Sequence, residues 1–346
     1  MKRILALAAV SMGLLLCGWP EAAEIPPEYD GNLVKAARAE GKLVIYSAMR
    51  RPLGMKLVDR FQKRFGIKVD FTRKTTGAIV QMIEAERLAK VARFDITGPA
   101  DESVVRRWMK QGFLEPYRPA NAKFIPPHLV TDAGYVNYAW LSVYVIAYNK
   151  KKVSASDLPA TWKDAANPRW RHRIALADPK TAAGARIFLD IAADRYGWDY
   201  FHALGKNAPL LVSSIAALPR MLSSGEADLA LVASEADILE MISKGEPFGV
   251  VYPEDFIPAT NFAIAMRKNA AHSHAARLWL EFELSMETQQ IYADSGRLSL
   301  REGVKFPFER PPLKSLKMVI PDPDRLDARR NELLKKFTET LCQGRP

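Results

Sequence analysis

The chain contains very little cysteine, with only Cys17 and Cys342 among its 346 residues. Cys17 lies in an N-terminal segment that we expect to be removed, and the single cysteine that is left cannot form an internal disulfide. No group of cysteines has the spacing of a zinc site. The fold must therefore be stabilised by hydrophobic cores, and a chain of this length can build two of them.

The sequence also lacks the short motifs of common enzymes. It has no nucleophile elbow, no HExxH sequence and no Walker loop, and no spacing of Asp, Glu or Ser singles out an acid–base pair. We therefore expect a protein that is not an enzyme and that holds no cofactor. A secreted hydrolase is the alternative of another class, and turnover of a panel of esters and phosphates would reveal it. Repeats and low-complexity tracts are absent as well, which excludes solenoids and long disordered tails.

No apolar run is long enough to cross a membrane, which takes about 20 residues. Residues 1–23 instead have the pattern of a secretory signal: Lys2 and Arg3, an apolar run over 4–16, and the small residues Ala22-Ala23 before the cut. Cys17 raises a lipid anchor as an alternative, but a lipoprotein signal requires a small residue where Leu16 stands. The mature protein is predicted to be exported to the periplasm in soluble form.

Acidic residues are outnumbered by basic ones, and the full chain has a formal charge of +11 and a pI near 9.5. Such a charge raises the possibility of nucleic acid binding. The basic residues are spread along the chain without a DNA-binding motif, so we expect no nucleic acid partner. A basic surface also attracts small acidic molecules, whereas the simpler interpretation is a solvated basic surface.

An aromatic and β-branched run from Tyr135 to Tyr148 is the longest strand signal in the chain. It exceeds the length of an ordinary strand, usually 3–10 residues. A strand that starts in one lobe and ends in another explains this length, and a long edge hairpin within one domain is the alternative. A polar stop at 149–152 and the sequence Pro159-Ala160-Thr161-Trp162 follow.

This order of motifs resembles the first hinge crossing of bacterial extracellular solute-binding proteins. In that family the crossing strand ends in "YNK", here Tyr148-Asn149-Lys150, and leads to a "P-x-TW" segment, here 159–162. The opening "GKLVIYSA" at 41–48 and "GEADLAL" at 225–231 are similar to segments of the same family. The resemblance covers about residues 33–304.

Elsewhere, short apolar strands alternate with helical patterns, which predicts mostly parallel sheets with helices on both faces. The fold class is therefore α/β. The resemblance implies a two-lobed periplasmic-binding-protein-like II fold with a two-strand hinge. The predicted division is a signal peptide at 1–23, the first part of lobe 1 at 24–139, lobe 2 at 140–260, and the completion of lobe 1 with C-terminal helices at 261–346.

Ligands of open α/β sheets lie at the carboxyl ends of strands, beside helix N-termini. In lobe 1 the corresponding loops are 47–51, 75–77 and 100–101. In lobe 2 the loop 178–184 precedes a helix whose free N–H groups favour an anion, and its small residues would let a ligand approach the backbone. The predicted ligand-binding residues are Ser47, Ala48, Arg50, Thr75, Thr76, Gly77, Ala100, Asp101, Trp140, Ser142, Lys180, Thr181, Ala182, Ser213, Ser234 and Glu235.

The resemblance implies a monomeric receptor that closes on a solute and delivers it to an inner-membrane ABC permease. The sequence is most similar to the ferric-iron-binding-like branch, whose iron binders carry an adjacent tyrosine pair after a lobe 2 strand. Here that place reads Ala233-Ser234-Glu235, and no Tyr-Tyr pair occurs in the chain. We therefore expect no metal and a small organic anion as ligand: a phosphate ester, phosphonate or carboxylate. A ferric iron or iron-anion binding protein of the same fold is the alternative.

Overall fold

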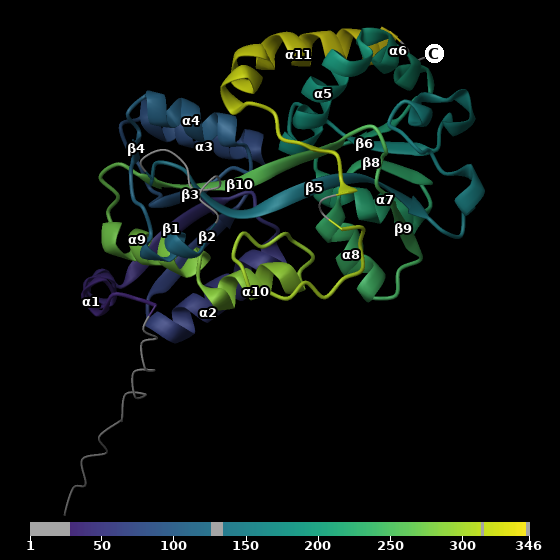
Figure 1. The fold of residues 1–346 in the computed structure, drawn as a ribbon. Helices are drawn as coiled ribbons and strands as arrows, with labels where there is room; N and C mark the ends of the chain where they lie inside the picture. The colour runs from purple at the N-terminus through teal and green to yellow at the C-terminus, as the bar shows by residue number, and fades with distance from the viewer. Residues whose placement is uncertain (1–27, 126–133, 313–314, 344–346) are drawn as a thin grey trace, which may run out of the picture.

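A computed structural model describes residues 28–125, 134–312 and 315–343 of the chain (Figure 1). The predicted signal segment, including Cys17 and the expected cleavage site, lies outside the described residues. The described chain forms two α/β halves on either side of two long strands. We call the half with the N-terminal elements lobe 1 and the other half lobe 2.

Lobe 1 starts with alternating helices and strands. Strand β1 pairs in parallel with both β2 and β3. Helices α1 and α2 end at Gly41 and Gly66, whose positive φ angles of 67° and 71° suit glycine. The elements are α1 (Gly31–Glu40), β1 (Lys42–Ser47), α2 (Arg51–Phe65), β2 (Lys68–Arg73), α3 (Thr76–Leu88), β3 (Ile96–Gly98), α4 (Glu102–Lys110), β4 (Leu114–Glu115) and the 3₁₀ turn η1 (Ala120–Phe124).

Lobe 2 repeats this scheme around β6, which pairs in parallel with β7 and β8. Its elements are three 3₁₀ turns, η4 (Ala155–Asp157), η5 (Asp164–Ala166) and η6 (Pro168–Trp170), followed by β6 (Ile174–Ala177), α5 (Ala183–Tyr196), α6 (Trp198–Lys206), β7 (Leu210–Val212), the turn η7 (Ile215–Ala217), α7 (Leu218–Ser224), β8 (Leu229–Ser234), α8 (Glu235–Ser243) and β9 (Phe248–Val251).

Two long strands, β5 (Asn137–Asn149) and β10 (Ile257–Arg267), cross between the lobes and pair with each other in antiparallel fashion. The remaining part of β10 pairs with β3 and β4 in lobe 1, while that of β5 pairs with β8 and β9 in lobe 2. The strand order is β2-β1-β3-β10-β5-β8-β6-β7, so hydrogen bonding continues from one lobe into the other through the crossing strands. The predicted two-lobed α/β fold with a two-strand hinge is confirmed.

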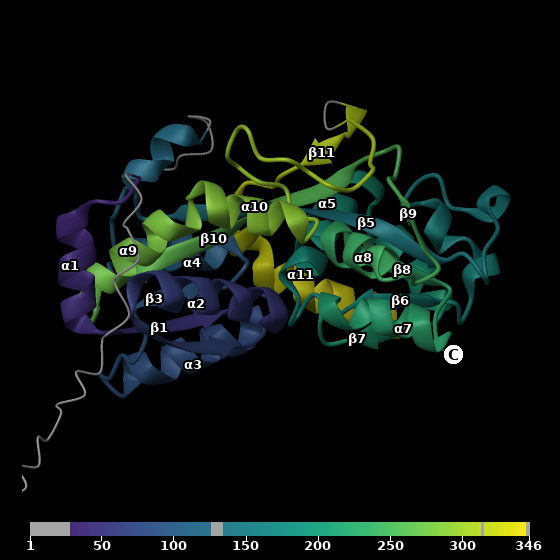
Figure 2. The same ribbon diagram turned by 90° about the horizontal axis from the view of Figure 1, so that it is seen from below.

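The chain after β10 adds α9 (Ser273–Glu283), α10 (Met286–Asp294), β11 (Met318–Val319) and α11 (Pro323–Gln343). Helices α9 and α10 lie on lobe 1. Helix α11 runs from α4 of lobe 1 to α5 and α6 of lobe 2 and contacts all three (Figures 1 and 2). One face of α11, with Leu326, Leu333 and Phe337, is buried in the lobe 2 core.

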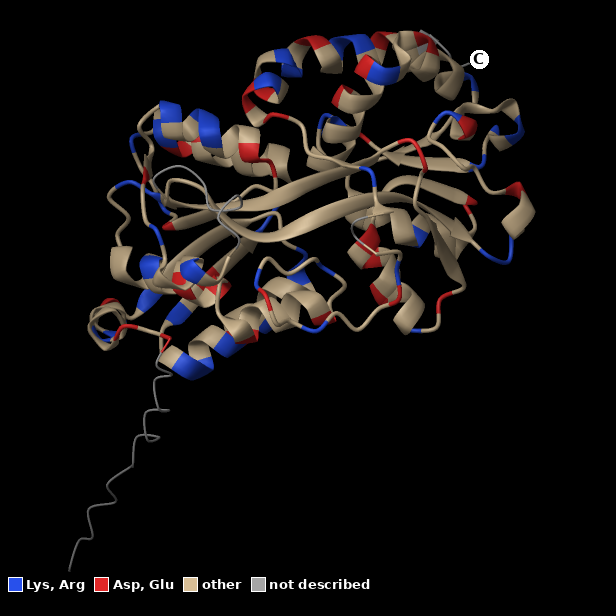
Figure 3. Cartoon of the chain, viewed as in Figure 1, with Lys and Arg blue, Asp and Glu red and all other residues tan. Residues whose placement is uncertain are grey.

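Basic and acidic side chains are interspersed over the helices of both lobes, and α11 carries both signs along its length (Figure 3). Many of them form ion pairs, such as Lys63 with Asp59 at 2.9 Å. Among the helices that the structure describes, none is both long and apolar enough to span a membrane.

Candidate functional site

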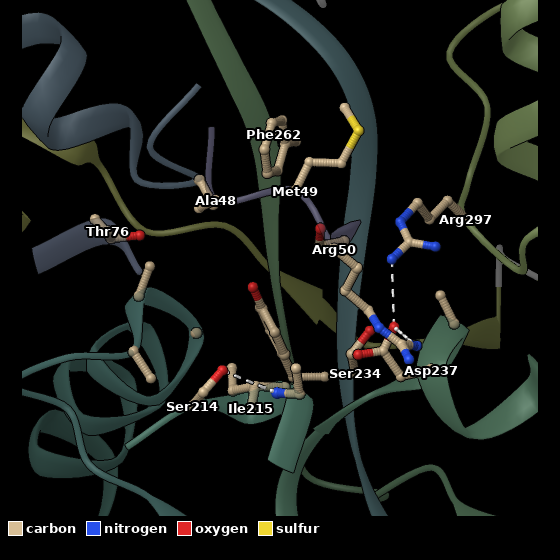
Figure 4. A pocket seen from close by; sticks show the side chains of 18 of the residues that line it. Ala48, Met49, Arg50, Thr76, Ser214, Ile215, Ser234, Asp237, Phe262 and Arg297 are labelled. Atoms are coloured by element: carbon tan, nitrogen blue, oxygen red, sulfur yellow. Dashed lines mark hydrogen bonds and ion pairs between the residues drawn. The ribbon is translucent and has the colours of Figure 1, made fainter. Parts of the chain in front are cut away.

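A cavity of about 120 Å³ lies between the lobes, where the loops after the strands of each lobe meet (Figure 4). Lobe 1 contributes the start of α2, the end of β2 and the start of α3, and lobe 2 contributes the first residues of α5 and α8 and the turn η7. The crossing strands contribute residues 140–144 and Phe262. One water molecule needs roughly 10–15 Å³ of such space, so the cavity suits a small solute.

Most of the predicted ligand-binding residues come together around this cavity. They arrive from strand ends and helix starts that lie far apart in the sequence. Those that line it are Ala48, Arg50, Thr75, Thr76, Ala100, Trp140, Ser142, Thr181, Ala182, Ser234 and Glu235, whereas Ser47, Gly77, Asp101, Lys180 and Ser213 do not.

Two of the residues that do not line the cavity form hydrogen bonds within its loops. Ser47 is buried, and its hydroxyl accepts a hydrogen bond from the Met49 amide at 3.1 Å. Ser213 presents its carbonyl oxygen to the Thr181 hydroxyl, which donates to it at 2.7 Å. Both residues therefore hold loops in place.

Gly77 and Lys180 lie where the two lobes touch. A Cβ atom on Gly77 would be 3.6 Å from the carbonyl oxygen of Lys180. On the other side, a Cβ on Gly296 of lobe 1 would be 3.0 Å from the backbone of Ala236 in lobe 2. The lobes are thus in contact at these two places.

Asp101 does not face the cavity, contrary to its prediction as a ligand residue. Its carboxylate caps α4 through the Ser103 amide (3.1 Å) and pairs with Arg186 of α5 at 2.7 Å and Arg330 of α11 at 3.4 Å. Asp101 and Arg186 are each 2% exposed. Burial acts to raise the pKa of Asp101, but the two guanidinium groups outweigh it and lower that pKa. Asp101 therefore joins the lobes structurally.

Arg50 lines the cavity, but its guanidinium already has carboxylate partners. Nη1 lies 3.0 Å from Asp237 and 3.2 Å from Glu240, both on α8 of lobe 2. Arg297 reaches the same Asp237 carboxylate at 3.3 Å from another direction (Figure 4). Burial opposes the charge of Arg50, yet Asp237 and Glu240 outweigh it and raise the Arg50 pKa. These ion pairs connect the lobes across the cleft.

Several cavity residues were not among the predicted set, notably Arg73, Tyr144, Asp237 and Arg297. Arg73 ends β2, so the strand-end rule that selected Thr75 applies equally to it. Tyr144 belongs to the predicted crossing strand. Asp237 and Arg297 carry no comparable local signal, because each reaches the cavity only through the packing of the two lobes.

The helices α5 and α8 direct N-termini without side-chain caps at the cavity. Their N-cap residues, Ala182 and Ser234, make no capping hydrogen bond, and Ala183, Gly184 and Ala236 of their first turns line the cavity. The first amides of a helix lack partners within it and carry partial positive charge. Both N-termini from lobe 2 can therefore bind anionic oxygens.

The carboxylate of Glu235 is engaged away from these amides. It accepts a hydrogen bond from the Tyr252 hydroxyl at 2.6 Å and lies 3.5 Å from Arg310. Burial raises the pKa of Glu235, against the lowering effect of both partners. The two partners of the Glu235 carboxylate, Tyr252 and Arg310, do not line the cavity.

The cavity hydroxyl groups also have partners within the protein. Thr76 donates to the Pro99 carbonyl, Thr181 donates to Ser213 as described, and Ser142 accepts from the Trp140 indole at 2.9 Å. The donors that remain for a solute include the first backbone amides of α5 and α8 and the Arg73 guanidinium. This donor-rich lining favours an anionic or strongly hydrogen-bond-accepting ligand.

Position 184 requires glycine because the Tyr144 ring packs against it, and not because a solute needs the space. A Cβ at Gly184 would lie 2.4 Å from the Tyr144 ring and 2.7 Å from Ile215. Gly184→Ala should lower the free energy of unfolding by about 1–3 kcal/mol, although alanine favours helices by about 1 kcal/mol. Urea denaturation measures this. Gly31→Ala is the matched control, since a Cβ there has nothing within 4 Å, and equal effects of the two substitutions would contradict the prediction.

The fold and this inter-lobe cavity define the class of two-lobed binding proteins. The profile of the family "bacterial extracellular solute-binding protein" matches residues 42–298. The chain therefore belongs to this family, whose members serve ABC transporters.

Individual relatives are distant. An uncharacterized protein of Haemophilus influenzae is 23% identical over 267 residues, which cover 74% of this chain and 76% of that protein. Iron-bound HitA from Pseudomonas aeruginosa is 20% identical with a TM-score of 0.74, covering 86% of this chain and 99% of HitA. AfuA from Actinobacillus pleuropneumoniae with exogenous fructose-6-phosphate is 22% identical with a TM-score of 0.79, covering 87% and 99%. These two structures are similar in fold to this chain.

Within the described part of the chain, no group of three or more His, Cys, Asp or Glu side chains is arranged to hold a metal ion. His272 and His274 instead pair with Asp95 at 2.7 Å and Glu40 at 2.8 Å.

Proposed function

We propose that this protein is the periplasmic receptor of an ABC importer and that it captures a small organic anion between its lobes. The observation that supports the anion is the cavity lining, in which two uncapped helix N-termini meet three arginines, Arg50, Arg73 and Arg297. Phosphate esters, phosphonates and carboxylates fit such donors. The solute enclosed between the lobes would then be delivered to an inner-membrane permease.

The lobe boundaries belong to the same proposal. The predicted division gives residues 24–139 and 261–346 to lobe 1 and 140–260 to lobe 2, with the hinge where β5 and β10 pair near Leu141 and Asn261. Helix α11 at the end of the chain nevertheless packs one face into the lobe 2 core. Relative rotation of domains about such a hinge is a known mode of ligand capture. The protein acts as a monomer outside the inner membrane, after removal of residues 1–23.

Iron is the second candidate ligand, because iron-bound HitA shares this fold. Ferric iron requires phenolate or carboxylate oxygens. Among the described residues that line the cavity, Tyr144 is the single tyrosine. Burial raises the pKa of Tyr144, which disfavours the phenolate that iron would need. The organic anion is therefore the better match to the side chains in place.

Binding should change the fluorescence of Trp140. This side chain lines the cavity, stacks on Phe262 at 3.9 Å between ring centroids and lies 5.3 Å from the Arg297 guanidinium. We expect a saturable emission change with the bound anion and a smaller radius of gyration by X-ray scattering. Trp198→Phe, in α6 of lobe 2, is the matched control and should retain the change.

A calorimetric panel of phosphates, phosphonates, dicarboxylates, sugars, polyamines and ferric citrate tests the ligand class. Tight binding of a neutral sugar or polyamine without any anion would overturn the proposed class, and tight ferric binding would favour the iron alternative. Turnover of a phosphate ester would identify a hydrolase instead.

A further inference from the structure

We infer that Arg73 is the residue that neutralises the charge of the solute, whereas Arg50, the arginine expected for this role, holds the lobes together by pairing with Asp237. The inference rests on the proposed function and assigns roles within the same cavity. It also defines the solute more narrowly, as a dianion such as a phosphate monoester or phosphonate.

The three cavity arginines all come from lobe 1 but differ in their partners. Arg50 pairs with Asp237 and Glu240, as described above. Arg297 has Asp237 at 3.3 Å and donates to the carbonyl and hydroxyl oxygens of Ser295, each at 3.1 Å. For Arg73, in contrast, no acceptor among the described residues lies within hydrogen-bond or ion-pair distance. The cation without a counter-charge is therefore Arg73.

The surroundings of Arg73 disfavour an unpaired cation. The side chain is partly buried, and burial followed by the nearby Arg50 lowers its pKa, while Asp237 acts in the opposite direction from beyond ion-pair distance. A partly desolvated cation beside a second cation is unfavourable until an anion approaches. A solute anion that binds at Arg73 supplies the missing partner.

The charges around the cavity favour two negative charges on the solute. Asp237 and Glu240 face Arg50 and Arg297, and Glu240 is shared with Lys244 at 2.5 Å, so the cavity retains at least the single positive charge of Arg73. The N-termini of α5 and α8 each add the equivalent of about half a positive charge. Arg73 and the N-termini of α5 and α8 line the same small cavity, so one doubly charged group can contact them together. A phosphate monoester carries about −1.5 to −2 charge at pH 7.

The experiment compares methyl phosphate, a dianion at pH 8, with dimethyl phosphate, a monoanion of similar size, by titration calorimetry at constant ionic strength. Wild-type protein should prefer methyl phosphate. Arg73→Gln should weaken methyl phosphate binding by about ten- to hundredfold and abolish the preference for methyl phosphate over dimethyl phosphate. Arg73→Lys should lose less affinity for methyl phosphate. Arg51→Gln is the matched control, because Arg51 is exposed and does not line the cavity. Its affinity for methyl phosphate should remain within twofold of the wild-type value.

Arg50→Gln separates the two roles. With saturating methyl phosphate it should keep a larger radius of gyration than wild type, because closure loses the Arg50 pairs with α8, while Arg73→Gln at saturation should reach the wild-type radius. If methyl phosphate binds Arg73→Gln within twofold of wild type, the Arg73 assignment is overturned and the proposed function stands. If wild-type protein closes only on a neutral or cationic solute, both fail.

A second measurement applies even when neither methyl ester binds the wild-type protein. Phenylglyoxal modifies accessible, unpaired guanidinium groups, and peptide mass spectrometry locates the product. Arg73 should react faster than Arg50 and Arg297, and equal or slower modification of Arg73 would overturn the inference.

Discussion

Asp101→Ala is expected to lower the free energy of unfolding by about 3–5 kcal/mol, because it leaves Arg186 buried without a counter-ion. The two side chains are each 2% exposed and 2.7 Å apart. Arg330 of α11 adds a second, weaker contact at 3.4 Å. Chemical denaturation followed by circular dichroism measures the loss.

Two further variants identify the cause of this loss. The double variant Asp101→Ala with Arg186→Met should be more stable than Asp101→Ala alone, since no unpaired charge is left inside. Asp59→Ala removes the exposed pair with Lys63 and should change stability by less than about 1 kcal/mol. A loss below about 1 kcal/mol for Asp101→Ala would show that the pair is hydrated rather than buried.

Glu283→Gln should stabilise the protein at pH 8 and flatten its dependence on pH. Glu283 is buried in lobe 1 and accepts hydrogen bonds from the Trp279 indole at 2.8 Å and from the Tyr292 hydroxyl. Burial raises its pKa to about 7, although both hydrogen bonds lower it. In the unfolded chain a glutamate has a pKa of about 4.3.

The direction of this pH dependence follows from the difference in proton binding between the folded and unfolded protein. Between about pH 4.3 and 7 the folded protein retains a proton that the unfolded chain has released, so the free energy of unfolding falls as pH rises. The full change is about 3–4 kcal/mol by pH 8. The glutamine variant stays neutral and should avoid this loss, as thermal unfolding from pH 4 to 8 would show. Exposed Glu339→Gln is the control, and parallel pH profiles of wild type and Glu283→Gln would contradict the prediction.

The crossing strand could be predicted because its signal is local. Residues from Tyr135 to Tyr148 are apolar, aromatic or β-branched, and β5 spans Asn137–Asn149. The antiparallel pairing of β9 with β5 is not local, since it joins Val251 to Ile146. Helix α6 was not predicted, although Tyr200, Phe201 and Leu204 mark its buried face. It follows α5 after the single residue Gly197, which leaves no loop to indicate a new element.

The amino-acid sequence by itself determined the α/β class, the crossing strands and several of the loops that meet at the cavity. Strand and helix periodicity, helix caps and glycine stops act over a few residues, and they place Arg50 and Thr75 in loops that follow strands. The tertiary structure alone decided which arginine is available. Asp237 approaches Arg50 and Arg297 only when α8 of lobe 2 packs against lobe 1. Ion pairing depends on distances of a few ångströms between segments far apart in the chain, so local sequence patterns cannot distinguish the paired Arg50 from the unpaired Arg73.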